Sequence, residues 1–109
     1  MKVKPGDTMW CVVMFDLPVQ TAQERRESSS FRKLLLDCGF SMIQFSVYAK
    51  YSPTIQSNTA IEKAIRASLP ANGEVRIFHL TDKQWASATR IIARQQEAVE
   101  APPSQLALF

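Results

Sequence analysis

The stretch MWCVVMFDLP, residues 9–18, decides the fold of this chain of 109 residues. Its first seven residues are β-branched, aromatic or otherwise apolar, and Asp16 and Pro18 end the run, which is the pattern of a strand that stops at a turn. Successive side chains of a strand point to opposite faces of its sheet, and in this run both sets are apolar. The sequence therefore predicts a central strand that is covered on both faces.

A helix is predicted after this strand. Thr21 can cap its first turn, and Glu24 stands three residues later, as in a capping box. Apolar residues then recur at helical spacing from Phe31 to Cys38, and Gly39 is placed to end the helix. We expect the apolar side of this helix to pack on the sheet.

Further elements follow at regular intervals. Residues 42–50 alternate between apolar and polar and predict one half-polar strand, with Tyr48 on its polar side. Ser57 or Asn58 can cap a second helix, which ends at Pro70. Residues 74–80 predict the next strand, because they are rich in β-branched and aromatic side chains.

This order predicts an α+β fold, the ferredoxin-like split βαβ arrangement, in which an antiparallel sheet carries two helices on one face. Such a sheet leaves its other face bare, although the first strand is apolar on both sides. The simplest cover is a second copy of the chain, so we expect a homodimer through that face. The domain should span residues 9–93, between an N-terminal arm, 1–8, and a C-terminal linker and docking strand, 94–109.

Composition narrows the class of protein. The chain has 13 Lys and Arg against 10 Asp and Glu, a mild basic bias that is compatible with nucleic acid. Its apolar stretches are far shorter than a membrane-spanning helix, and no signal-peptide pattern is present, so we expect a cytoplasmic protein with no membrane partner. Cys11 and Cys38 lack metal-site spacing and are interpreted as buried thiols, while His79 is the single histidine.

The sequence after residue 80 is ambiguous. Asp82 can cap a helix that runs through Trp85, Ala88 and Ile92, whereas residues 89–92 can form a strand, and local rules favour the helix. Beyond a stiff Pro102-Pro103 linker, the chain ends in apolar residues that we expect to dock as a short strand on an open sheet edge. The candidate interface residues are Leu106, Leu108 and Phe109.

Three stretches, taken in order, resemble a known family. They are MFDLP at 14–18, FRKLL at 31–35 with Gly39 and Phe40 after it, and QFSVY at 44–48. Together they resemble the small adaptation protein of CRISPR systems, the ferredoxin-like, endoribonuclease-type partner of the CRISPR integrase. The resemblance extends from about residue 9 to residue 80, and the tail is similar to the branch found in systems with a single large effector nuclease.

The resemblance implies a homodimer that sits between two integrase dimers, where the assembly holds a short DNA duplex and inserts it into the CRISPR array. It also implies Mg²⁺-dependent endonuclease activity on RNA or double-stranded DNA, with an Asp at the end of the first strand as the metal-linked catalytic residue. Asp16 matches that position. A fifth strand after Trp85 is implied as well, against the local preference for a helix, and so is a C-terminal segment packed at the dimer or integrase interface.

Asp16 has a structural interpretation beside the catalytic one. A carboxylate between a strand and a turn commonly bonds nearby N–H groups. In a dimer, two copies that face each other across the axis would disfavour joint ionisation unless a cation neutralised them. Mg²⁺ needs only one or two carboxylates and keeps several waters, so one Asp per subunit suffices. His79 is a candidate base only by elimination, and we interpret it as a packed, hydrogen-bonded residue.

A cluster of basic residues in the first predicted helix is the candidate nucleic-acid-binding group. Any single member is typical of a solvated helix face paired with nearby acidic residues. As a group they suit a scaffold that holds a duplex through its phosphates without reading sequence, and a dimer would double the patch. The members are Arg25, Arg26, Arg32 and Lys33.

Two other functions remain open. A ferredoxin-like domain can serve as an interaction or small-ligand-sensing module, because fold does not fix function. A single-stranded RNA binder of the RRM type is disfavoured, because the chain has no Gly-Phe-rich strand with paired exposed aromatics. Trp10 and Trp85 are instead expected to be core or interface anchors. Salt-dependent affinity for a duplex separates the scaffold from the sensing module.

Overall fold

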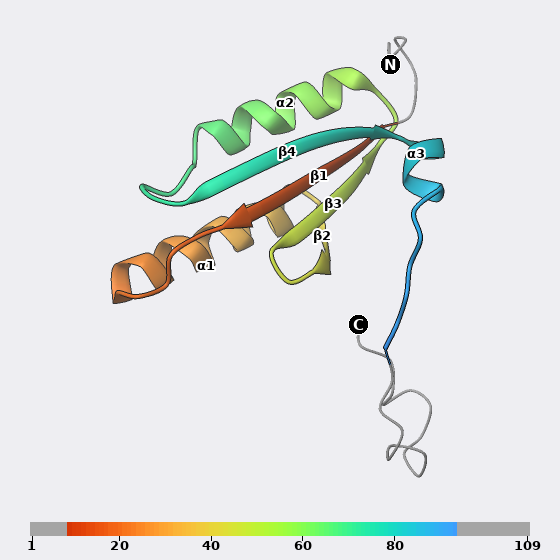
Figure 1. Ribbon diagram of the computed structural model, residues 1–109. Coiled ribbons are helices and arrows are strands. Elements are labelled where there is room, and N and C mark those ends of the chain that lie inside the picture. Colours follow the sequence, from red (N-terminus) through yellow and green to blue (C-terminus); the bar gives the residue numbers. More distant parts are fainter. Residues whose placement is uncertain (1–8, 94–109) are drawn as a thin grey trace.

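The computed structural model describes residues 9–93 (Figure 1). In chain order, its elements are β1 (Met9–Asp16), α1 (Ala22–Asp37), β2 (Ser41–Gln44), β3 (Val47–Ser52), α2 (Ile55–Arg66), β4 (Glu74–Thr81) and α3 (Asp82–Ala86). The arm at 1–8 and the segment 94–109 lie outside the described residues, as do the predicted interface residues Leu106, Leu108 and Phe109.

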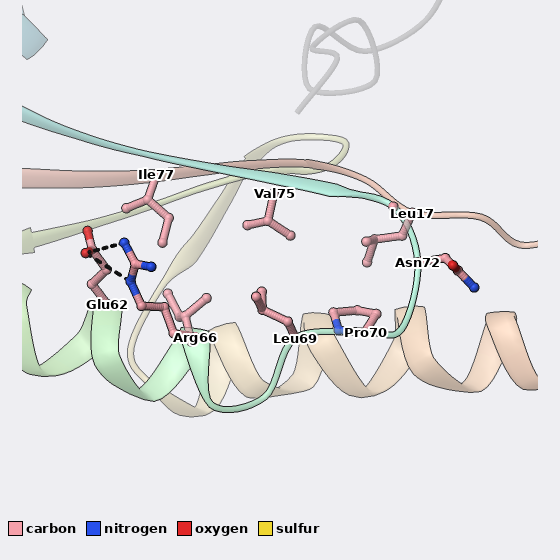
Figure 2. Close-up of a pocket in the computed structure, with 10 residues that line it drawn as sticks. Leu17, Glu62, Arg66, Leu69, Pro70, Asn72, Val75 and Ile77 are labelled. Carbon is pink, nitrogen blue, oxygen red and sulfur yellow. Dashed lines mark hydrogen bonds and ion pairs between the residues drawn. The ribbon is translucent and has the colours of Figure 1, made fainter.

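The four strands form one antiparallel sheet in the order β2-β3-β1-β4. The strand β1 pairs with β4 over its whole length and with β3 as far as Met14. Both long helices lie on the same side of the strands, as their ribbons show in Figure 2. The predicted ferredoxin-like arrangement, an antiparallel sheet with two helices on one face, is confirmed.

The core fills the space between the sheet and the two long helices. Leu35 of α1 and Ile65 of α2 are fully buried against alternate residues of β1. The loss of this apolar surface from water is the main force that holds the layers together. The buried cluster consists of Cys11, Val13, Phe15, Phe31, Leu35, Phe40, Tyr48 and Ile65.

The helix α1 begins and ends as its sequence predicts. The Thr21 hydroxyl accepts the Glu24 backbone N–H at 3.0 Å, and the Glu24 carboxylate accepts the Thr21 backbone N–H at 2.9 Å, which completes the capping box. After the helix, Gly39 adopts a φ of +95°, a conformation that residues with a Cβ rarely adopt.

The prediction of one strand over residues 42–50 is wrong. The chain turns at Phe45 and Ser46, so this stretch forms the hairpin β2–β3. The turn contains no Gly, Asn or Pro, and Ser46 itself takes the left-handed conformation, with a φ of 67°. The turn and a register irregularity in β2 break the alternation, so Tyr48 lies in the core, 4% exposed, and not on a polar face.

The second helix begins three or four residues earlier than predicted and ends at Arg66, before the predicted end at Pro70. Thr54 is the N-cap of α2, and its hydroxyl accepts the Ser57 backbone N–H at 3.2 Å. Neither Ser57 nor Asn58 caps the helix, although both are good capping residues. Asn58 is 2% exposed.

The chain continues from β4 into α3 without a linker. Thr81 ends the strand and caps α3 through a second capping box with Gln84. The helix stops at Ala86, and residues 87–93 form neither helix nor strand. The expected fifth strand is therefore absent from residues 85–93, because none of the strands between residues 9 and 93 pairs with them, and the local preference for helix holds only as far as Ala86.

The other face of the sheet carries no helix apart from α3, at one end. There Trp85 stacks on Trp10 with ring centroids 4.3 Å apart, and the Trp10 indole N–H donates to Asp82 at 2.9 Å. Further along this face, Met14 and Phe78 are 40% and 41% exposed. Val12, between Trp10 and Met14 on this face, is 8% exposed, so within the described part of one chain the predicted cover of β1 is missing only toward Met14. No helix within residues 9–93 is long and apolar enough to cross a membrane.

Candidate functional site

Asp16 is the last residue of β1 and lies on the helix-free face of the sheet. It is two and four residues beyond Met14 and Val12, which places its side chain on the same face as theirs. The residue is exposed, and its carboxylate makes no hydrogen bond or ion pair with any residue between 9 and 93. The interpretation of Asp16 as a hydrogen-bonded cap is therefore not supported, and its oxygens are available to a ligand.

Gly73 allows the next strand to approach Asp16 closely. A Cβ at this glycine would lie 2.7 Å from the Asp16 carbonyl oxygen and 2.8 Å from a methyl group of Leu17. The φ of Gly73, +103°, is also one that favours glycine. The start of β4 can therefore lie directly against the end of β1.

This approach brings a second carboxylate beside Asp16. Glu74, the first residue of β4, is the register partner of Asp16 on the same face. It forms an exposed ion pair with Arg76, Nε to Oε1 3.1 Å. Sequence reasoning missed Glu74, although the ferredoxin-like strand order contains the signal: the start of the last strand lies beside the end of the first.

The carboxylates of one chain are just sufficient in number to hold a hydrated Mg²⁺ ion. No group of three or more His, Cys, Asp or Glu side chains gathers within the described range. Mg²⁺ is commonly held through one or two carboxylates and otherwise by water and substrate phosphates. Asp16, with Glu74 beside it, supplies that number.

The four predicted nucleic-acid-binding residues all lie on α1 but differ in their surroundings. Arg25 donates to the carbonyl oxygens of Val19 and Gln20, both at 3.2 Å. Lys33 pairs with Asp37 at 3.1 Å, and both side chains are exposed. Arg26 is exposed and has no hydrogen-bond or ion-pair partner among residues 9–93.

Arg32 differs from the other three because it is half-buried between aromatic rings. Its Cζ lies 4.9 Å from the ring centroid of Phe15 and 4.8 Å from that of Phe45. The structure therefore does not bring the four residues into one uniform patch. Arg25, Arg26 and Lys33 are its exposed members, and Arg26 and Lys33 lie seven residues apart on one side of α1.

The comparisons with known proteins agree with this geometry. The family model described as "CRISPR associated protein Cas2" matches residues 9–88. The chain belongs to the Cas2 family. A Cas2 relative from Paracidovorax avenae, named a CRISPR-associated endoribonuclease, is 43% identical over 101 residues, which are 93% of this chain and 94% of the relative. Another of that name, from Flavobacterium psychrophilum, is 39% identical over 94% of this chain and 89% of its own.

A solved Cas2 structure shares the fold. The Streptococcus pyogenes Cas2 crystal structure at pH 6.5 matches with a TM-score of 0.60 and 21% sequence identity, over 77% of this chain and 99% of that one. The resemblance found in the three sequence stretches is thereby confirmed at the level of family and fold.

His79 is not placed to act with Asp16 of this Cas2-family chain. It is the register partner of Cys11, five residues before Asp16 on β1, which corresponds to about 17 Å along a strand. Its Nε2 lies 3.1 Å from Glu62 Oε1 on α2. This hydrogen bond, followed by the contacts of Arg66, lowers the pKa of Glu62. The hydrogen bond expected of His79 is confirmed, but the expectation that it is packed is wrong, because the residue is exposed.

The two cysteines of this Cas2-family chain are free thiols, as predicted, but only Cys11 is buried, because Cys38 is half-buried. Burial raises the pKa of Cys11 to about 11, with Glu62 adding to the effect. Since the thiolate is the reactive form, Cys11 is a core residue and not a nucleophile.

A cleft of about 270 Å³ opens between α2 and the start of β4 (Figure 2). Leu17, Leu69 and Val75 line its middle, and the Glu62–Arg66 ion pair stands at one end. Pockets for small ligands usually enclose about 300–1,000 Å³. The two charged side chains already neutralise each other, so the cleft gives the small-ligand-sensing alternative no specific support.

Proposed function

We propose that this Cas2-family chain is a subunit of CRISPR adaptation: a homodimeric scaffold that binds duplex DNA and the CRISPR integrase, and a Mg²⁺-dependent endonuclease acting on RNA or DNA through Asp16. One observation carries the proposal. An unpaired carboxylate, Asp16, ends the central strand on the open, largely apolar face of the sheet. The names of the relatives, CRISPR-associated endoribonucleases, support the same activity.

The open face supports pairing with a second copy of the chain. Val12, Met14 and Phe78 form an apolar strip across β1 and β4, and the latter two are about 40% exposed. A second copy stacked on this strip by a twofold axis would cover it and contribute a second Asp16. The two carboxylates would then repel each other, which favours a divalent cation between them.

Mg²⁺, when bound, would supply a more acidic water and neutralise charge on a phosphate. The chain's own residues would hold the site: Asp16 as a ligand, and Gly73 by letting β4 approach the backbone of Asp16. Glu74 keeps its charge balanced through Arg76. No general base lies beside Asp16 within the described residues, so the proposal assigns none.

Nucleic acid would bind through the exposed basic residues of α1. Arg26 has no competing partner among residues 9–93, and the exposed Lys33–Asp37 pair is of a kind worth about 0–1 kcal/mol. Both side chains can therefore turn to phosphates at little cost, and Arg25 lies beside them. Such contacts position a duplex without reading its sequence.

The integrase contact is assigned to the C-terminal segment, with Leu106, Leu108 and Phe109 as its anchors. An apolar end on a polar tail suits docking on another chain. We expect that a protein without residues 106–109 still dimerises but no longer binds integrase.

Integration of a short duplex into a CRISPR repeat by the cognate integrase tests the function. Reactions would contain no added protein, the unmodified protein, Asp16→Asn, or the matched control Glu27→Gln, which makes the same kind of change on α1. RNA and duplex cleavage would be followed in parallel with Mg²⁺ and with EDTA.

We expect the unmodified protein and Glu27→Gln to stimulate integration and to cleave only with Mg²⁺, and Asp16→Asn to lose cleavage. Integration that persists with Asp16→Asn would show that scaffolding does not need the carboxylate. Absence of both activities from the unmodified protein would refute the proposal.

A further inference from the structure

The end of β1 that carries Asp16 is paired with a strand on one side only. Pairing with β3 stops at Met14, so beyond it only β4 continues the ladder. On the β3 side, a single backbone hydrogen bond remains, from the Phe15 N–H to the Ser46 carbonyl oxygen at 3.1 Å. The position of Asp16 therefore depends on the turn of the β2–β3 hairpin.

This turn is poorly stabilised by local structure. Ser46 is a left-handed residue other than glycine, a conformation that costs on the order of 1 kcal/mol. The strand β2 has only four residues, all exposed, and Phe45 at the turn is 82% exposed. A short hairpin with so little buried surface opens easily unless other contacts hold it.

Arg32 supplies those contacts. Its guanidinium lies between the rings of Phe15 and Phe45, at 4.9 Å and 4.8 Å. One terminal nitrogen donates to the Ser46 hydroxyl at 3.2 Å, and the other lies 3.5 Å from the Tyr48 hydroxyl. One planar group from α1 thus touches the end of β1, the turn and the start of β3.

We infer that Arg32 is a positioning residue for the Asp16 site and not a phosphate contact, an inference that rests on the proposed function. Its flat guanidinium holds the hairpin turn against Phe15, and through the Phe15–Ser46 hydrogen bond it fixes the backbone one residue before Asp16. Lysine cannot replace it, because an ammonium group keeps the charge but neither stacks between two rings nor donates in a planar fork.

The test compares Arg32→Lys with Lys63→Arg, which makes the opposite exchange at an exposed position on α2 that has no part in the proposed site. Ser46→Ala removes only the hydroxyl acceptor and should act in the same direction with a smaller effect. Three quantities would be measured on the full-length protein: amide hydrogen exchange of Phe15, kcat and KM of Mg²⁺-dependent RNA cleavage, and the salt dependence of duplex binding. Asp16→Asn is run beside them.

For Arg32→Lys we expect exchange of the Phe15 amide to rise about tenfold while that of Val13 stays unchanged, since only the turn side of β1 is released. The kcat should fall about tenfold with KM within about twofold, because a displacement near 1 Å misplaces the site without removing substrate contacts. Lys63→Arg should change neither quantity.

Two results would overturn the inference. One is an Arg32→Lys protein that keeps the kcat of the unmodified protein, whatever its Phe15 exchange. The other is an Arg32→Ala protein whose salt slope for duplex binding falls by about one, which would make Arg32 a phosphate contact. Failure of the proposed function looks different: Asp16→Asn would then cleave as fast as the unmodified protein.

Discussion

The same strands form both faces of the sheet, but the two faces differ in how far they are covered. On the helix-covered face, Cys11 and Val13 of β1 are completely buried by α1 and α2. On the helix-free face, Met14 of the same strand is 40% exposed and Phe78 beside it 41%. The covered face holds one chain together, whereas the open face is apolar surface in excess of what the chain needs, and the Asp16 carboxylate lies at its end.

Shortening a side chain on the covered face should lower the stability of the fold more than shortening an exposed one. Leu35→Ala would remove a fully buried side chain from between α1 and the sheet. We expect it to lower the free energy of unfolding by about 2–5 kcal/mol, from lost burial and the cavity left behind. Urea denaturation followed by circular dichroism measures this loss.

Leu36→Ala is the matched control, because Leu36 is adjacent in sequence but 54% exposed. Its effect should stay within about 0.5 kcal/mol. Equal losses at the two positions would contradict the assignment of α1's buried side.

Adding a charge to the open face should weaken dimerisation and leave the fold intact. Phe78→Glu places a carboxylate on the apolar strip, where a stacked second copy would have to bury it. We expect the circular dichroism spectrum to be retained and the dimer dissociation constant to rise at least about 100-fold, which is about 2.7 kcal/mol. Sedimentation equilibrium measures that constant.

Leu36→Glu makes the same kind of change on the helical side and should leave association unaltered. A Phe78→Glu protein that still dimerises as tightly as the unmodified one would mean that the copies do not meet through this face.

The smallest effect is expected at the edge of the covered face, where Glu62 joins α2 to β4. The hydrogen bond with His79 is the main cause that lowers the pKa of Glu62 in the folded protein. The ionised carboxylate therefore stabilises the fold above pH 4.5, the ordinary pKa. This stabilisation is lost as the pH falls below 4.5 and through the lower folded pKa. Glu62→Gln should cost up to about 1 kcal/mol at pH 6 and less at pH 3. Thermal unfolding at the two pH values tests this, and a cost that does not depend on pH would contradict it.

The sequence predicted the elements whose signals are local. The apolar run of β1 and the Thr21–Glu24 capping box of α1 each lie within a few residues, and both are confirmed. The hairpin turn was missed because Ser46 carries no turn signal of its own: its conformation is held by Arg32, fourteen residues earlier in the chain. The start of α2 was misplaced because Thr54, Ser57 and Asn58 can all cap a helix, and only packing selects among them.

The sequence likewise predicted some residues of the candidate site and missed others. The sequence motif identified Asp16, but its neighbour Glu74 follows only from the strand order, and Gly73 only from the close approach of two backbones. Four basic residues in one helix looked alike in the sequence. Their surroundings separate them, because Arg32 lies between aromatic rings contributed by other elements, which no spacing rule within α1 can show.

Thr81 belongs to both β4 and the cap of α3, so the sheet and this helix meet without a hinge. Each residue of a helix rotates its side chain by about 100°. One residue added between Thr81 and Asp82 would therefore swing Trp85 away from Trp10, and the ring stack that seats α3 would be lost. The strand β4 and the Trp10–Trp85 stack thus fix the direction in which α3 leaves the sheet.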